Sequence, residues 1–321
     1  MTTKILTQAD VRKAISMPKA ISAVENALAE YARGSAQMPP KTYLSLAQFD
    51  GDFRAMPAFL DNAAGVKWVN SHPHNFERFG LPTVMGLYIL SDPTNALPLA
   101  VMDATYLTAI RTGAAAAVAS KYLAPLPSTT LGLLGCGVQA HFLLEAHNVL
   151  FPELKIIVND LDTDTANAFA RKYNAQIGSV EQVSNCDIVC TSTPSRSPLI
   201  SQEMLKNKTV HINAMGADAS GKQEIASEIV RDASIIVDEL EQAAHSGEIN
   251  VPLKNQAIAV SDIVATLGQV IVGERNPRSE YPKRTTLFDS TGLALQDVAV
   301  ARAIFDAANK LSLGQTINFF N

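Results

Sequence analysis

A glycine-rich hexamer near the middle of the chain has the spacing that binds phosphates. Residues 135–140 (GCGVQA) match G-x-G-x-x-A, follow the apolar run 131–134 and precede a stretch with helical spacing. In that setting Gly135 allows a tight turn, Gly137 lets a pyrophosphate approach a helix N-terminus, and Ala140 permits close packing of helix on strand. The hexamer therefore predicts a dinucleotide-binding turn, with a purely structural glycine turn as the alternative.

An acidic residue stands where the ribose of a dinucleotide would be recognised. The strand expected over 155–160 ends in Asn159 and Asp160. A carboxylate at this position hydrogen-bonds the ribose hydroxyls of NAD and repels the 2′-phosphate of NADP. Asp162 and Asp164 add negative charge, and no arginine is close in sequence. We therefore expect NAD rather than NADP, and a simple turn residue is the alternative for Asp160.

Two further strand ends carry polar groups. Thr193 follows the strand expected over 187–192, and Asp218 follows the strand expected over 208–214. Because ligands in open α/β sheets bind outside the carboxyl ends of strands, we expect Thr193 to face the cofactor and Asp218 to be placed for general-base work. A turn and a helix cap or loop acid are the respective alternatives. Lys222 either pairs with Asp218, contacts the cofactor or is a solvated surface lysine.

Three basic residues before the predicted domain boundary interrupt apolar segments. Lys67 lies in the middle of the apolar strand 64–71, where a buried lysine is costly unless it is paired. We expect it to line a cleft, with a lowered pKa suited to acid/base work, and an edge-strand lysine that prevents aggregation is the alternative. Arg54 and Arg111 suit bidentate binding of a carboxylate or a phosphate, or structural ion pairs.

Metal and disulfide chemistry receive little support. His72-Pro-His74 has no cysteine or histidine partner at zinc-ligand spacing, so we expect no metal. His211 alternates with apolar neighbours and is expected to be a satisfied core histidine. The few cysteines fit buried thiols in a reducing cytoplasm better than a disulfide framework; they are Cys136, Cys186 and Cys190.

Composition narrows the class of protein. The chain has 321 residues, enough for two domains, and its 47% hydrophobic and 18% charged residues exclude a disordered chain. A net charge of −5 without a basic run argues against a nucleic-acid partner. The lack of a long apolar run argues against a membrane span, and the N-terminal segment lacks the features of a signal peptide. A cytoplasmic enzyme or binding protein fits best.

The elements that must position these residues fall into two groups. Thr7 with Asp10 predicts a capping box, and a second helix opens at Ser16 and Pro18 and ends at Gly34. A run of strands follows and then an Ala-rich helix over 105–124; the strands are expected over 42–47, 53–60, 64–71, 84–91 and 98–103. After Pro127, helices alternate with strands expected over 129–134, 155–160, 187–192, 208–214 and 234–239.

This order predicts an α/β protein with a Rossmann-type doubly wound parallel sheet plus an α+β domain. We place the α+β domain at 1–124 and the NAD-binding domain at 125–302. The final helix, about 293–311, is amphipathic. We expect the end of the chain, about 303–321, to pack back on the first domain.

Segments that run nearly end to end resemble the ornithine cyclodeaminase/mu-crystallin family, and most closely its archaeal-type alanine dehydrogenase branch. They include RAMP at 54–57, GVKWVNSHP at 65–73, VMDAT at 101–105, RTGA at 111–114, GCGVQ at 135–139, INAMGAD at 212–218, GKQE at 221–224 and FDSTG at 288–292. The resemblance implies that the first domain binds substrate and forms a homodimer through its strands, that the second binds NAD(P), and that substrate lies between the two.

The resemblance also implies roles for individual residues. Arg54, Lys67 and Arg111, with the neighbouring Thr112, match the residues that contact the substrate carboxylate. Lys67 matches the acid/base lysine, and Asp218 matches the aspartate that activates water or the amine. The implied cofactor contacts are Thr83, Arg111, Gly135, Gly137, Val138, Gln139, Asp160, Thr193, Ala214, Gly216, Lys222 and Ser290. Val138 stands where many members of the family have alanine.

The function that the resemblance implies is an NAD-dependent amino-acid dehydrogenase. It would interconvert L-alanine with pyruvate and ammonia by hydride transfer from Cα through an iminium. The alternatives are an ornithine cyclodeaminase, which forms L-proline and ammonia from L-ornithine, and a cyclic-imine (ketimine) reductase. A non-enzymatic, mu-crystallin-like binder of NAD(P) or another ligand is a further alternative. These outcomes differ by pocket size and by one nucleophile, which the sequence does not reveal.

Overall fold

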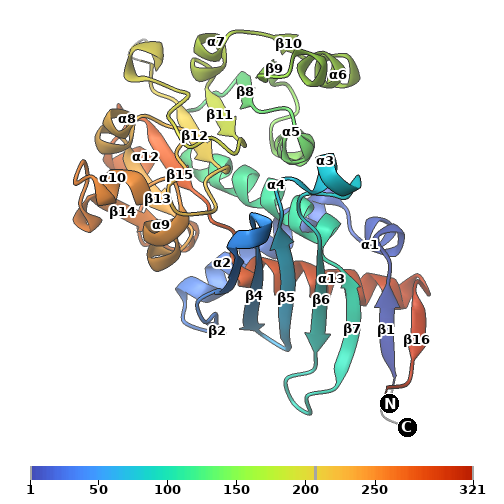
Figure 1. Cartoon of the computed structure of the whole chain (residues 1–321). Coiled ribbons are helices and arrows are strands. Elements are labelled where there is room, and N and C mark those ends of the chain that lie inside the picture. The colour runs from blue at the N-terminus through green and yellow to red at the C-terminus, as the bar shows by residue number, and fades with distance from the viewer. Residues whose placement is uncertain (1, 206–207, 320–321) are drawn as a thin grey trace. The chain divides into compact units, whose positions relative to one another are not determined.

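The computed structural model describes residues 2–205 and 208–319, and it divides into two compact units (Figure 1). Unit 1 comprises Met1–Arg111 and Leu293–Asn321, and unit 2 comprises Thr112–Gly292. The sequence placed the corresponding boundaries at 124/125 and 302/303. The difference arises because the helix α4 (Thr105–Leu123) is continuous across the first boundary. The prolines at 125 and 127 mark where this helix ends, not where the packing divides.

Unit 1 is built on one eight-stranded sheet. Its strands follow the order β16–β1–β7–β6–β5–β4–β2, with β3 paired to β4. Every pairing is antiparallel except β1 with β7. The strands are β1 (Thr3–Leu6), β2 (Ala36–Gln37), β3 (Thr42–Leu46), β4 (Gly51–Leu60), β5 (Ala63–Ser71), β6 (Gly86–Ser91), β7 (Pro98–Asp103) and β16 (Gln315–Ile317). The five predicted strands are confirmed, with small shifts of their ends. The short β1, β2 and β16 were not predicted.

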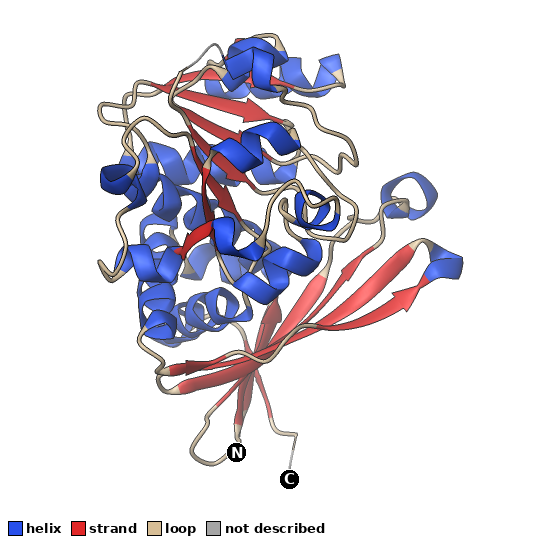
Figure 2. Cartoon of the chain, turned by 90° about the vertical axis from the view of Figure 1, so that its left-hand side faces the viewer, coloured by secondary structure: helices blue, strands red, loops and turns tan. Residues whose placement is uncertain are grey.

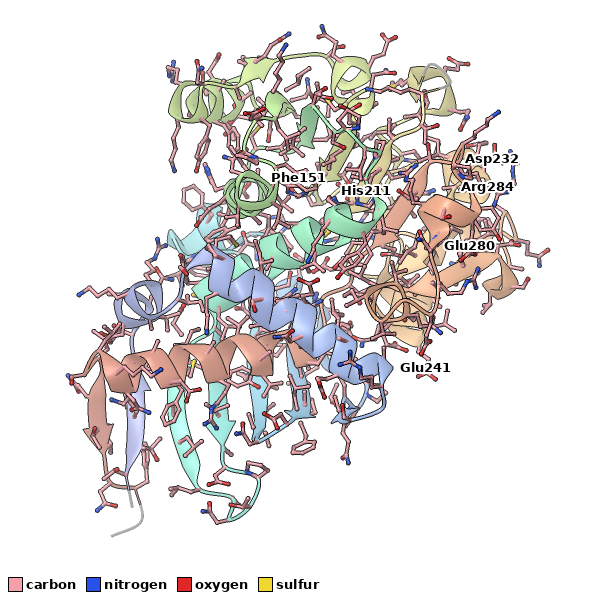
Figure 3. The ribbon with its side chains drawn as sticks, turned by 180° about the vertical axis from the view of Figure 1, so that it is seen from behind. Phe151, His211, Asp232, Glu241, Glu280 and Arg284 are labelled. Carbon is pink, nitrogen blue, oxygen red and sulfur yellow. The ribbon has the colours of Figure 1, made fainter. Side chains whose placement is uncertain are left out.

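Two long helices cover one face of this sheet. The helix α13 (Ala294–Lys310) packs against α2 (Met17–Ala32) and against β4, β5 and β6, as Figure 3 shows from behind. The covered strand face is mostly apolar, with Met56, Val69 and Tyr88 buried, and it also carries Arg54 and Lys67. The two short helices are α1 (Gln8–Ala14), which begins with the predicted capping box, and α3 (Asn75–Phe79).

The opposite face of the sheet carries exposed apolar side chains. Trp68 is 45% exposed, and the ring of Phe53 stacks on it with centroids 5.2 Å apart. Leu44 and Leu87 lie on the same face, because they are the strand partners of Phe53 and Trp68, and Ile89 shares it two residues after Leu87. We call these five residues the apolar sheet face. Phe53, Trp68 and Leu87 line a hollow of about 780 Å³.

Unit 2 is a parallel α/β domain. Its eight strands follow the order β10–β9–β8–β11–β12–β15–β13–β14, and all neighbours are parallel. The strands are β8 (Thr130–Leu134), β9 (Lys155–Asn159), β10 (Gln176–Ile177), β11 (Ile188–Thr191), β12 (His211–Ala214), β13 (Ser234–Val237), β14 (Ile263–Thr266) and β15 (Thr286–Asp289). The predicted Rossmann-type fold class is confirmed. The sequence analysis did not predict β10, β14 or β15.

Helices cover both faces of the parallel sheet (Figure 2). Successive residues of β11 show why: Ile188 and Cys190 join one apolar core, and Val189 joins the other. A strand that is buried on both faces must be apolar at every position, which is how the central strands read. The helices are α5 (Val138–Leu150), α6 (Thr163–Tyr173), α7 (Val180–Ser184), α8 (Ser227–Asp232), α9 (Leu240–Ser246), α10 (Asn250–Lys254), α11 (Leu267–Ile271) and α12 (Pro277–Glu280).

The interior of unit 2 also holds polar residues that the sequence placed in the core. His211 is fully buried and bonds Thr286 and Asn213, which confirms the predicted core histidine (Figure 3). The three cysteines are buried free thiols, also as predicted. Among the described residues, no helix is long and apolar enough to cross a membrane.

Candidate active site

Lys67 is a buried, paired lysine in the middle of the unit 1 sheet. It lies on β5, which has β4 and β6 on its two sides, so the edge-strand alternative was wrong. The side chain is 1% exposed, and its Nζ lies 2.8 Å from Oδ2 of Asp297 on α13. Desolvation lowers the pKa of Lys67 to about 7, with Arg111 adding to the shift and Asp297 opposing it. A lysine of this kind exchanges its proton near neutral pH.

Asp297 joins Lys67 to Arg111. The Nε of Arg111, from α4, donates to Oδ1 of Asp297 at 3.1 Å, and one terminal nitrogen donates to Gln296 at 3.4 Å. Asp297 is completely buried. One carboxylate therefore faces two cationic side chains, and the cluster keeps an excess of positive charge when Lys67 is protonated. Asp297 and Gln296 were not predicted from the sequence. The only signal was an acid in the first turn of an amphipathic helix.

The structure also places the other two predicted substrate residues, Arg54 and Thr112, and the predicted cofactor residue Thr83. Arg54 shares the covered sheet face and makes two 2.9 Å bonds to Asp52, so the ion-pair alternative is present in the structure. Thr112 follows Arg111 directly in α4 and is 8% exposed. The exposed Thr83 lies between α3 and β6, and its carbonyl accepts from the backbone N–H of His72.

The glycine loop leaves open space at the start of α5. Gly135 has φ of +92°, a left-handed backbone that favours glycine. Gly137 is the N-cap of α5, and a Cβ added there would meet no atom within 4 Å. The first N–H groups of a helix have no partner inside the helix, so they remain available to an anion. Val138, the first residue of α5, is 70% exposed. The buried Oε1 of Gln139 has no hydrogen-bond partner within the described part of the chain.

Asp160 fixes the glycine loop. Its Oδ2 accepts from the backbone N–H of Cys136 at 2.7 Å, and its Oδ1 accepts from that of Asp162 at 2.8 Å. The turn role that the sequence offered as an alternative is therefore present. A carboxylate oxygen has two lone pairs, so each oxygen can still accept from a ribose hydroxyl. The position of Asp160 thus fits the nucleotide as well as the turn.

The strand ends of unit 2 bring the remaining cofactor candidates to one edge. The strand register aligns Leu134, Thr191, Ala214 and Asp289, the last residues of β8, β11, β12 and β15. Three more candidates follow within a few residues at this edge: Thr193, Gly216 and Ser290. The backbone N–H and the hydroxyl of Thr193 both donate to Glu224. The Ser290 hydroxyl donates to Asp238 at 3.4 Å.

Asp218 and Lys222 form an ion pair four residues apart, in the non-helical segment between β12 and α8. The Nζ of Lys222 lies 2.5 Å from Oδ1 of Asp218, and the two side chains are 20% and 35% exposed. Of the possibilities left open by the sequence, pairing is the one present. Both residues follow β12, whose carboxyl end belongs to the edge described above.

Comparison with known proteins places these features in a family. The model of the ornithine cyclodeaminase/mu-crystallin family matches residues 1–312. The chain is 49% identical to the alanine dehydrogenase of Archaeoglobus fulgidus over 100% of its own length and 99% of that protein.

Solved structures agree. An archaeal alanine dehydrogenase dimer with bound NAD superimposes with a TM-score of 0.96 at 49% identity, covering 100% of both chains. The Δ1-pyrroline-2-carboxylate reductase of Thermococcus litoralis, in complex with NADH and L-proline, superimposes with a TM-score of 0.92 at 32% identity, covering 98% of this chain and 100% of the other. The resemblance read from the motifs is confirmed: the chain belongs to the ornithine cyclodeaminase/mu-crystallin family.

Proposed function

We propose that the protein is an NAD-dependent alanine dehydrogenase that interconverts L-alanine and water with pyruvate and ammonia. The observation that carries the proposal is the buried cluster of Lys67, Asp297 and Arg111. It lies in a chain that is 49% identical, over its whole length, to an archaeal alanine dehydrogenase.

Unit 2 is proposed to bind NAD, as relatives with NAD and NADH do. The pyrophosphate would take the open space at Gly137, and Asp160 would accept from the ribose hydroxyls. The other end of the cofactor would be held at the strand edge by Thr193, Ala214, Gly216, Lys222 and Ser290. When bound, NAD supplies the hydride acceptor for the Cα–H bond of the amino acid.

The cationic cluster is proposed to hold the substrate carboxylate. Arg111 offers a planar pair of donors, and protonated Lys67 adds a second positive charge that Asp297 alone does not balance. Arg54 and Thr112 are further candidates for this contact. With a pKa of about 7, Lys67 can also give a proton to the substrate and take it back. Asp218 is proposed to activate the water that attacks the iminium of the substrate.

The apolar sheet face is proposed to be covered by a second copy of the chain. Exposed Trp68, Leu44 and Leu87 on one sheet face are unusual for a protein surface, and a solved relative is a dimer. The three free, buried cysteines fit the cytoplasm, where we propose that the enzyme works.

The test is a substrate panel with purified protein, followed by NADH absorbance. We expect NADH loss with pyruvate only when ammonium is present. L-Ornithine with catalytic NAD is assayed in parallel for proline and ammonia, and Δ1-pyrroline-2-carboxylate is assayed for NADH loss. Proline from ornithine without net NADH change would make the protein a cyclodeaminase. NADH loss with the cyclic imine alone would make it an imine reductase. Bound NADH with no turnover on any arm would indicate a binding role.

A further inference from the structure

The buried carboxylate of Glu224 collects four hydrogen bonds. Its Oε1 accepts from the backbone N–H of Thr193 at 2.7 Å and from the Thr193 hydroxyl at 2.8 Å. Its Oε2 accepts from the Thr191 hydroxyl at 2.7 Å and from the backbone N–H of Gly216 at 2.9 Å. The side chain has no exposed surface. Nothing in the proposed chemistry uses Glu224 directly.

These four donors come from two different strand ends. Thr191 and Thr193 belong to the end of β11 and the segment after it, and Gly216 follows β12. A Cβ added to Gly216 would lie 2.3 Å from the Thr193 carbonyl oxygen and 2.5 Å from Glu224 Oε2. The two segments therefore pack backbone against backbone, and the carboxylate of Glu224 holds them at that distance.

A second carboxylate fixes Glu224 itself. Glu248, also fully buried, accepts from the backbone N–H of Glu224 at 2.9 and 3.0 Å and from that of Ile225 at 2.7 Å. Burial raises the pKa of Glu224, and its four hydrogen bonds oppose that rise. The arrangement is directional: Glu248 holds the Glu224 backbone, and the Glu224 side chain holds the two strand ends.

We propose that Glu224 is a positioning residue for NAD, which sets the placement of Thr193 and Gly216 and is itself set by Glu248. The inference rests on the proposed NAD site and deepens it. Glu224 touches the cofactor contacts and not the cofactor. Replacing the Glu224 carboxylate should therefore weaken NADH binding by displacing the segments that carry Thr193 and Gly216. The rest of the unit 2 core should stay unchanged.

Glutamine is the informative replacement because of how the donors are divided. Each carboxylate oxygen receives one backbone N–H, from Thr193 on Oε1 and from Gly216 on Oε2. Threonine hydroxyls can rotate to suit an amide, but backbone N–H groups cannot. Whichever way the glutamine amide turns, its NH₂ faces one of these two backbone donors. Glu224→Gln must therefore displace one of the two segments.

The experiment measures NADH binding by fluorescence titration on the full chain, without pyruvate or ammonium. Glu224→Gln is expected to raise the Kd for NADH by about tenfold or more, since a buried bond to a charged group is lost. Thr191→Val removes only one hydroxyl donor and should raise the Kd by about threefold. Ser184→Ala is the matched control: it loses one buried hydroxyl bond to the Val180 carbonyl in the same unit and should leave the Kd within about twofold.

A double variant and a comparison of the KM values for NADH and pyruvate test the proposal further. Thr191→Val should raise the Kd by a smaller factor in the Glu224→Gln background than in the wild type, because the two residues belong to one hydrogen-bond network. The KM for pyruvate, measured at saturating NADH, should change far less than the KM for NADH, measured at saturating pyruvate and ammonium. A merely structural role would lower Tm and the active fraction, and it would leave the NADH affinity of the folded protein as it was.

The inference is overturned if Glu224→Gln binds NADH within about twofold of the wild type, or if Ser184→Ala weakens NADH as much. If Glu224→Gln does not fold, Thr191→Val decides alone: an unchanged Kd overturns the inference. A wild type that binds NADH but does not consume it with pyruvate and ammonium refutes the proposed dehydrogenase and leaves this test standing. A wild type that does not bind NADH overturns both.

Discussion

Replacing Asp297 with asparagine removes the charge between two cations and keeps the shape of the side chain. An opposite charge at hydrogen-bond distance shifts a pKa by about 1–3 units, so the pKa of Lys67 should fall from about 7 to roughly 4–6. Lys67 would then be neutral at pH 7. Arg111 would be left as a buried cation without its carboxylate partner.

The magnitude of the stability loss follows from this asymmetry. Breaking a buried ion pair by removing one partner costs roughly 3–5 kcal/mol, because a charge is left without compensation. Lys67 avoids its share of this cost because it can lose its proton. We therefore expect a loss of stability at the low end of the range, about 3 kcal/mol. For a domain the size of unit 1, that corresponds to a fall in Tm of roughly 6–12 °C.

The assay is the pH dependence of kcat/KM for pyruvate at saturating NADH, together with thermal melts. Because protonated Lys67 is the proposed carboxylate contact and acid, activity should fall as pH rises through its pKa. In Asp297→Asn this fall should move to lower pH by at least about one unit, with NADH affinity unchanged. Asp306→Asn, on the same helix, is the control: its carboxylate pairs with Arg302 at the surface and should change stability by at most about 0.5 kcal/mol.

If the fall of kcat/KM with rising pH stays at the wild-type pH in Asp297→Asn, Asp297 does not set the pKa of the group that limits activity. The reasoning is also refuted if Asp306→Asn shifts this fall equally. In the first case the fall belongs to another group, and Asp297 is only a structural partner.

Three further predictions test other parts of the structure. Lys67→Met should abolish turnover and keep NADH binding. The pKa of Lys67 is about 7 in the folded chain and 10.5 as its ordinary value, so the unfolded chain binds the extra proton between these values. From pH 7 to 9 the free energy of unfolding should therefore change by about 2 kcal/mol more favourably in the wild type than in Lys67→Met, as denaturant titrations can measure. Gly137→Ala should leave Tm unchanged, because its Cβ meets nothing, and should weaken NADH by about tenfold in titrations. Gly113→Ala should instead lower Tm, since its Cβ would lie 2.3 Å from the Phe142 carbonyl oxygen. Burial lowers the pKa of His147 from 6.5 to about 4, so the unfolded chain binds the proton first as pH falls. From pH 6.5 to 5 the free energy of unfolding should fall by about 2 kcal/mol less in His147→Gln than in the wild type, as thermal melts can measure.

The features that the sequence predicted have local signals. The glycine hexamer stands between an apolar strand and a helix, and all of that evidence lies within about twenty residues. Lys67 was recognisable because one charged residue interrupts an alternating strand. The capping box of Thr7 and Asp10 is equally local.

The features that the sequence did not predict depend on pairing at a distance. Asp297 is an ordinary first-turn acid until α13 packs on β5 and places it against Lys67. β15 is only four residues long and lies between β12 and β13, although β13 precedes it in the chain. Glu224 appeared in a motif, and only the folded loops show its four donors. Residue type and spacing identify a charged group, but its partner is set by tertiary packing.

The discontinuity of unit 1 has a consequence for biosynthesis. Unit 2 is one continuous segment, whereas unit 1 needs residues 293–321 to supply α13 and β16. A ribosome makes the strands β1 to β7 first, then the whole of unit 2, and only then the helix that carries Asp297, the partner of Lys67. Asp297, which pairs with Arg111, lies 186 residues further along the chain and is translated later. Unit 2 can therefore fold during translation, while Lys67 acquires its carboxylate partner only as synthesis ends, so an interrupted chain holds unit 2 without the Lys67–Asp297 pair.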